Sequence, residues 1–150
     1  MNEPRGTRDH PATTRAHAAP DSGGGAALER WVFAAILVVG FLFRLRCAWR
    51  TPFWFDELFT LWMARHPLSE MLPLLAGDVH PPLATLLVAG WRALGGEGTA
   101  WLKLLPLSIG MLTLVATHGF ARSLFGRRVA LLALAVIALH PMLIYFSQEL

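Results

Sequence analysis

The distribution of apolar and charged residues predicts three membrane-spanning helices. Residues 104–121 and 129–148 contain no charged side chain. Each run is about as long as the ~20 residues that cross a ~30 Å hydrocarbon core at ~1.5 Å per residue. Another uncharged run, 31–43, continues past Arg44 and Arg46, whose long side chains we expect to reach the membrane surface. The predicted spans are residues 31–49, 101–120 and 129–146.

Two shorter helices are expected between the first and second spans. Residues 57–66 are amphipathic, with Asp56 available as a cap and Pro67 as a stop. Residues 82–94 begin at prolines suited to a first helical turn and end at glycines. A helix over 82–94 is about 20 Å long, which is too short to cross the bilayer. We therefore expect both helices to lie on the membrane surface.

Composition and charge agree with an integral membrane protein whose fold class is all-α. Hydrophobic residues make up 55% of the 150 residues and charged residues only 15%, against ~25% charged in soluble proteins. The lysines and arginines are scattered beside apolar segments, so nucleic acid is not an expected partner. Residues 1–29 are rich in Ala, Pro, Thr and Gly and predict a disordered tail, while 30–150 form one membrane domain. Cys47 is the only cysteine, so no intrachain disulfide can form.

The charge of the connecting segments predicts the orientation in the plasma membrane. The sequence RSLFGRR at 122–128 holds three arginines and no acidic residue, so it should face the cytoplasm. The segment 53–82 holds four of the ten acidic residues and should lie outside, if 82–94 does not cross the membrane. The N-terminus is then cytoplasmic, and the acidic segment lies on the outer face.

Asp56 and Glu57 are the first candidates for chemistry in this outer segment. Neighbouring side chains on a helix diverge by about 100°, so at most one of the two points into a site. One interpretation makes Asp56 an N-cap and Glu57 a partner of the helix dipole. The other makes Asp56, beside Trp54 and Phe55, a general base. Spacing alone leaves both open.

Further polar residues are predicted on the same face. Asp78 and His80 suit either a divalent metal or the turn that starts a helix, although two ligands do not make a metal site. Lys103, at the outer end of its span, suits either a lipid phosphate or interfacial anchoring. Glu149 should emerge on the face that carries Asp56. His140 precedes Pro141 and is expected to satisfy backbone groups freed at a kink.

Taken in order, these motifs resemble the N-terminal part of the membrane-embedded GT-C glycosyltransferases. The residues that carry the resemblance are FWFDE at 53–57, DVHPPL at 78–83, the early cation and proline Lys103 and Pro106, RSLFGRR, and HPMLIYFSQE at 140–149. Within that family the chain is most similar to the bacterial group related to protein O-mannosyltransferases and lipid A aminoarabinose transferases. The match covers roughly residues 31–150.

The resemblance implies a hexosyl- or pentosyltransferase that uses a polyprenyl-phosphate sugar as donor and a cell-envelope hydroxyl as acceptor, at the outer face. Asp56 and Glu57 fall on the family's acidic pair, with Asp56 as the base. Asp78 and His80 would line the site and hold a divalent ion, with Lys103 and Glu149 as further substrate-binding residues. Lys103 departs from the arginine expected there, which places a bidentate phosphate grip in doubt.

Two further expectations concern the kind of protein. Members of the family have many more spans, so we expect this chain to be an N-terminal fragment that is inactive alone. The alternative is a small polytopic transporter or assembly subunit whose outer carboxylates serve an ion path. Transporters tend to place acidic residues within spans or to contain internal repeats, and neither feature is seen here, so this alternative is less favoured.

Overall fold

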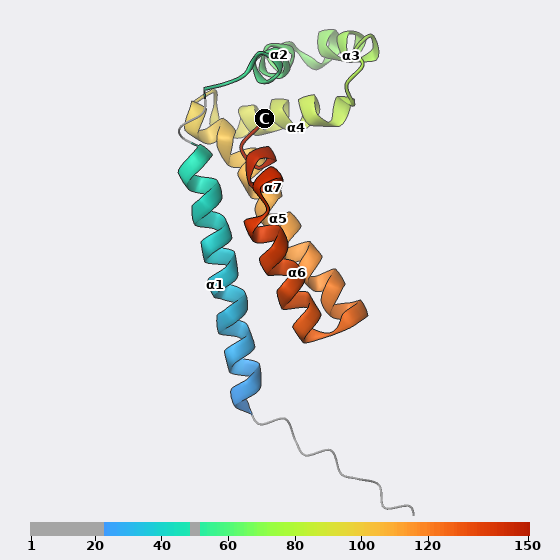
Figure 1. Cartoon of the computed structure of the whole chain (residues 1–150). Helices are drawn as coiled ribbons and strands as arrows, with labels where there is room; N and C mark the ends of the chain where they lie inside the picture. The colour runs from blue at the N-terminus through green and yellow to red at the C-terminus, as the bar shows by residue number, and fades with distance from the viewer. Residues whose placement is uncertain (1–22, 49–51) are drawn as a thin grey trace, which may run out of the picture.

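The computed structural model describes residues 23–48 and 52–150, and this part of the chain is helical without strands (Figure 1). The prediction of an all-α fold is confirmed. The helices in chain order are α1 (Gly23–Ala48), α2 (Phe55–Met63), α3 (Leu68–Ala76), α4 (Pro82–Gly95), α5 (Thr99–Phe125), α6 (Arg127–Leu139) and α7 (Pro141–Phe146).

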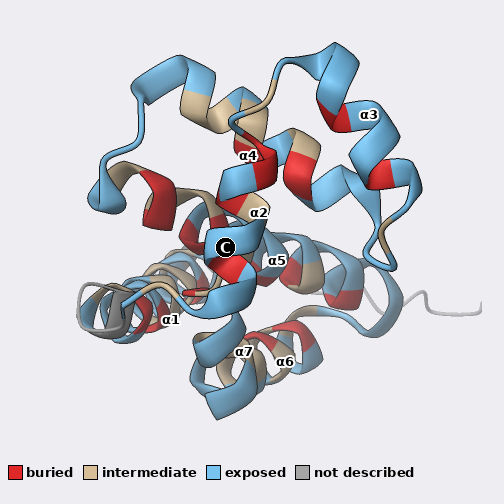
Figure 2. Ribbon diagram, turned by 90° about the horizontal axis from the view of Figure 1, so that it is seen from above, coloured by how far each residue is buried: buried red, intermediate tan, exposed pale blue. Residues whose placement is uncertain are grey.

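Helices α1, α5, α6 and α7 form an elongated bundle (Figure 1). Two of them, α1 and α5, are long and apolar enough to cross a membrane. Their lengths of 26 and 27 residues correspond to about 40 Å at ~1.5 Å per residue. Viewed along the bundle in Figure 2, much of the outward surface of these helices is exposed.

The third predicted span contains a break. Residue His140 is extended, with φ −68° and ψ 119°, and separates α6 from α7. Pro141 explains the break, because proline lacks an N–H for the helical hydrogen bond and disfavours helical backbone in the residue before it. Neither α6, with 13 residues, nor α7, with 6, has the length to cross a bilayer alone.

Arg44 of α1 fills this break, contrary to the expectation that its side chain reaches the membrane surface. Arg44 is 1% exposed, and its guanidinium group donates hydrogen bonds to the carbonyl oxygens of Ala138 at 3.0 Å and Ile137 at 3.4 Å. It also donates to the hydroxyl of Ser147, after α7, at 3.1 Å. The break frees backbone carbonyls that need a donor in an apolar environment, and Arg44 supplies it. His140 is exposed and does not cap α7 with its side chain, so its predicted role is wrong.

Helices α2, α3 and α4 form a layer across one end of the bundle, called the transverse layer below (Figure 1). One buried cluster joins Leu61 of α2 and Ala64, which follows α2, with Val88 of α4 and Leu102 of α5. The prediction for α4 is confirmed: Pro82 opens the helix, and Gly96 follows it with the positive φ of 85° that glycine tolerates.

The other predicted boundaries need correction. Residues 23–29 belong to α1 rather than to a disordered tail, and residues 1–22 and 49–51 lie outside the described part. The buried carboxylate of Glu29, in the second turn of α1, pairs with Arg122 and Arg127, which holds the start of α1 against the α5–α6 connection. Helix α2 begins at Phe55 and ends at Met63, so Asp56 lies inside the helix and Trp54 is the N-cap residue.

Candidate functional site

A cavity of about 290 Å³ opens in the transverse layer, between α2 and the start of α4. Three of the predicted site residues, Asp56, Asp78 and His80, line it together. They come from the first turn of α2 and from the turn that precedes α4. Proline and apolar side chains complete the walls, and Thr60 and Thr85 add hydroxyl groups. The cavity therefore combines the carboxylates of Asp56 and Asp78, the imidazole of His80 and two hydroxyl groups at one end of an apolar bundle.

The adjacent carboxylates Asp56 and Glu57 diverge, as helical geometry predicts. Asp56 is exposed and lines the cavity, while Glu57 is 3% exposed and points into the protein. Both lie in the first turn of α2, where the helix dipole favours a negative charge. Glu57 accepts a hydrogen bond at 2.8 Å from the N–H of Trp54, so Glu57 rather than Asp56 performs the capping. Asp56 is left without the cap role that one interpretation gave it.

Asp78 and His80 form a second polar pair on the cavity wall. The Nδ1 atom of His80 lies 3.2 Å from Oδ1 of Asp78, and the N–H of Val79 donates to the same oxygen at 2.7 Å. Desolvation by itself raises the pKa of Asp78, but the hydrogen bonds from the His80 side chain and from the backbone outweigh it, and the pKa is lowered overall. Asp78 is therefore an ionised carboxylate at neutral pH, and it orients the His80 ring.

A divalent metal at Asp78 and His80 stays a prediction. Asp78 and His80 approach each other, but within residues 23–48 and 52–150 no group of three His, Cys, Asp or Glu residues has the arrangement to hold a metal. Zinc sites use three or more protein ligands, whereas Mg²⁺ is usually held by one or two carboxylates together with water and substrate phosphates.

Glu57 is the centre of a buried polar cluster behind the cavity. Its Oε1 atom lies 2.8 Å from Nζ of Lys103 on α5, and the two side chains are 4% and 2% exposed. The same ammonium group donates to the carbonyl oxygen of Gln148 at 2.8 Å and lies 4.8 Å from the ring centroid of Phe53. The N–H of Leu150 donates to Glu57 Oε1 at 2.7 Å. The cluster thus joins α2, α5 and the segment after α7.

This environment changes the interpretation of Lys103. A buried ammonium with a carboxylate, a carbonyl and an aromatic ring around it is neither an interfacial anchor nor a free binding group for phosphate. Lys103 does not line the cavity that contains Asp56. In this structure its contacts connect α2, α5 and the segment after α7, and its predicted role in binding phosphate stays a prediction.

Glu149 lies near the site but faces a different cavity. It lines a space of about 240 Å³ between α1, α5 and α7, together with Arg44 and Ser147. The neighbouring residue Leu150 lines the Asp56 cavity instead. The predicted grouping of Glu149 with Asp56, Asp78 and His80 is therefore not what the structure shows.

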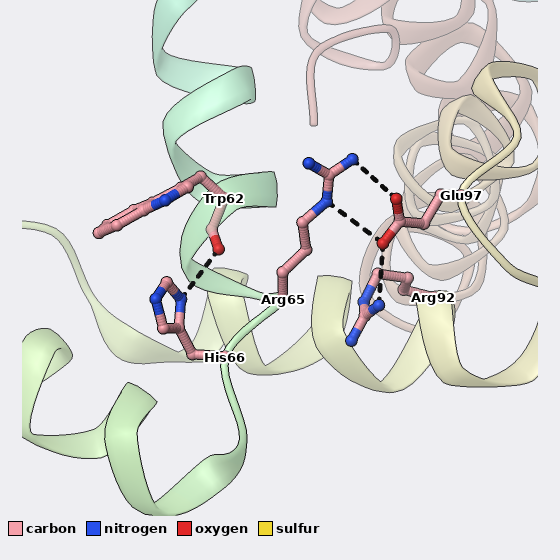
Figure 3. A network of polar contacts seen from close by, with 5 residues as sticks. All are labelled: Trp62, Arg65, His66, Arg92 and Glu97. Atoms are coloured by element: carbon pink, nitrogen blue, oxygen red, sulfur yellow. Dashed lines mark hydrogen bonds and ion pairs between the residues drawn. The ribbon is translucent and has the colours of Figure 1, made fainter.

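An ion-pair network lies where the end of α2 meets the turn between α4 and α5 (Figure 3). Arg65, after α2, binds Glu97 through two hydrogen bonds of 2.7 and 3.2 Å, and Arg92 of α4 binds it at 2.9 Å. Hydrogen bonds from Arg65 and then Arg92 lower the pKa of Glu97. Next to it, Trp91 and Trp101 stack at 4.5 Å, and each indole N–H donates to the other residue's carbonyl oxygen. These contacts fix the turn between α4 and α5.

Comparisons with protein-family models, with curated protein sequences and with solved structures find no match. The functional interpretation rests on the residues of this chain. Sequence reasoning missed the threonines of the cavity and the inward orientation of Arg44. The signal for Arg44 was available, since an arginine within an apolar segment requires a buried partner.

Proposed function

We propose that this chain belongs to a membrane glycosyltransferase that moves a sugar from a polyprenyl-phosphate donor to an envelope hydroxyl. The observation that carries the proposal is the cavity in which Asp56, Asp78 and His80 meet at one end of the apolar bundle. The ordered motifs that resemble GT-C glycosyltransferases supply the substrate class. A donor with a lipid tail also gives a reason for a polar cavity at the end of apolar helices.

We further propose that the bundle crosses the membrane three times, with α6 and α7 crossing as one broken helix. Two features support this topology. The exposed faces of α1 and α5 are apolar, which suits hydrocarbon better than water. Arg44 satisfies the carbonyls of Ile137 and Ala138 at the break, which is the condition for irregular backbone at membrane depth.

The transverse layer then lies on the outer face. The α5–α6 connection, with its arginines, is at the opposite end of the bundle from α2 and α4 (Figure 1). Short basic connections remain in the cytoplasm. Because α4 lies across the bundle rather than along it, the acidic layer and the basic connection fall on opposite sides of the membrane.

In the proposed reaction Asp56 acts as general base. Its carboxylate takes the proton of the acceptor hydroxyl, and the hydroxyl oxygen forms a bond to the anomeric carbon of the sugar. The bond between that carbon and the phosphate oxygen breaks, and the electron pair leaves with the polyprenyl phosphate. Asp78 accepts a hydrogen bond from Nδ1 of His80 and holds the ring at the cavity wall, where Nε2 can accept a hydrogen bond from a sugar hydroxyl.

The test compares two isosteric changes from carboxylate to amide. Membranes containing the full-length enzyme that carries this chain are supplied with radiolabelled polyprenyl-phosphate hexoses and pentoses, and label transferred to lipid and polysaccharide is measured. Asp56→Asn should lower transfer by at least about 100-fold, as expected for loss of a general base. Glu70→Gln, a change at an exposed carboxylate of α3 outside the cavity, should leave transfer unchanged. Transfer that survives in Asp56→Asn, at equal protein level, contradicts the role of Asp56.

A further inference from the structure

The end of the bundle opposite the candidate site contains another cavity. It has a volume of about 410 Å³ and lies between the start of α1 and the start of α6. Leu28, Val32 and Leu131 form an apolar wall, and Arg127 and Arg128 lie beside them. Gly25 is also at the cavity and leaves open space where another residue would have a side chain. The cavity therefore offers an apolar surface directly next to guanidinium groups.

The charge around this cavity is not balanced within the described residues. Arg122 and Arg127 share the single carboxylate of Glu29, so the cluster retains one positive charge. Arg128 is exposed and adds a second, and no described residue forms an ion pair with it. Helix α6 begins here with no acidic residue in its first turn and no side-chain cap, so its dipole also favours an anion.

We propose that this cavity binds the headgroup of an anionic phospholipid. The phosphate would lie against Arg128 and the start of α6, and an acyl chain would follow Leu28, Val32 and Leu131 along the bundle. Charge complementarity favours an anion, and the apolar wall favours one attached to a hydrocarbon chain. Basic pockets between transmembrane helices on the cytoplasmic side are known to bind anionic lipid headgroups. The site is separate from the Asp56 cavity.

Native mass spectrometry of the full chain in detergent tests the proposal, with dioleoyl phosphatidylglycerol and dioleoyl phosphatidylcholine as probes. The wild-type chain should bind one phosphatidylglycerol more tightly than phosphatidylcholine. Arg128→Gln should weaken this first binding event by about fivefold, the effect of one basic residue near a membrane surface. Arg128→Lys, which keeps the charge, should retain most of the affinity.

Arg30→Gln is the matched control. Arg30 lies at the same end of the bundle and is exposed, but it lines a different cavity. Its substitution should leave the first phosphatidylglycerol bound as in the wild type. Equal losses in Arg30→Gln and Arg128→Gln would indicate attraction by overall charge and overturn the proposal. Equal binding of the two lipids by the wild-type chain, as expected if another part of the chain fills the cavity, would overturn it too.

Discussion

Removal of the ammonium group of Lys103 should destabilise the fold more than removal of any exposed charge. Lys103→Met leaves the carboxylate of Glu57 buried at 4% side-chain exposure, with only the N–H groups of Trp54 and Leu150 as donors. Breaking a buried ion pair by removing one partner costs about 3–5 kcal/mol, because the remaining charge is uncompensated. Adding Glu57→Gln removes that charge and keeps an oxygen acceptor. The double variant should therefore be more stable than Lys103→Met alone.

The measurement is a double-mutant cycle on the free energy of unfolding, obtained by reversible titration with sodium dodecyl sulfate in mixed micelles. We expect a coupling free energy of at least about 1–2 kcal/mol between the two positions, within the range for residues in direct contact. The control is Arg65→Gln, which breaks the exposed pair with Glu97 in Figure 3, where the side chains are 53% and 38% exposed. Its effect should stay below about 1 kcal/mol. A coupling below about 0.5 kcal/mol at Glu57 and Lys103 would refute the reasoning.

Two further predictions concern the helical bundle and its proposed orientation in the membrane. Arg44→Met removes the donor to the carbonyls of Ile137 and Ala138. Amide hydrogen exchange over residues 142–148, after the break, should therefore become faster by the equivalent of about 2 kcal/mol. Unchanged exchange would contradict the role of Arg44. In a Cys47→Ser background, Leu94→Cys should react with an impermeant maleimide in intact cells, because Leu94 is 78% exposed at the end of α4. Ser123→Cys, near the α5–α6 connection, should react only in permeabilised cells, and the reverse pattern would overturn the proposed orientation.

Features set by local sequence could be predicted from the sequence. Helix α4 is the best example, since Pro82 and the glycines after Leu94 mark both ends within one short segment. The divergence of Asp56 and Glu57 also follows from helix geometry alone. Pro141 predicts a break at His140. The sequence alone does not show whether the carbonyl groups freed there find hydrogen-bond donors, and the separation of α6 from α7 depends on those donors.

The hydrogen-bond donors at the break, and most of the contacts of the site, come from residues distant in sequence. Arg44 reaches carbonyls 93 and 94 positions away, and Lys103 pairs with Glu57 across 46 positions. Patterns of apolar residues report which face of a helix is buried, but not which ionisable residues meet across segments. Desolvation makes such residues pair, so a cation and an anion at the ends of neighbouring apolar segments are expected partners. Applied to Lys103 and Glu57, that rule favours an ion pair over the phosphate contact predicted here.

The pairing of Glu57 with Lys103 also limits how variants at the acidic pair can be interpreted. Glu57 connects α2 to α5 and to Leu150, and Leu150 lines the same cavity as Asp56. Substitution of Glu57 would therefore disturb the cavity wall without removing any group that faces a substrate. Loss of transfer in a Glu57 variant would be compatible with a purely structural role. Asp56 lies one residue away on the same helix and has no such buried contacts. Asp56→Asn should therefore lower transfer without changing the free energy of unfolding, whereas Glu57→Gln should change both. Comparing the two variants separates the chemistry of the site from the structure that holds it.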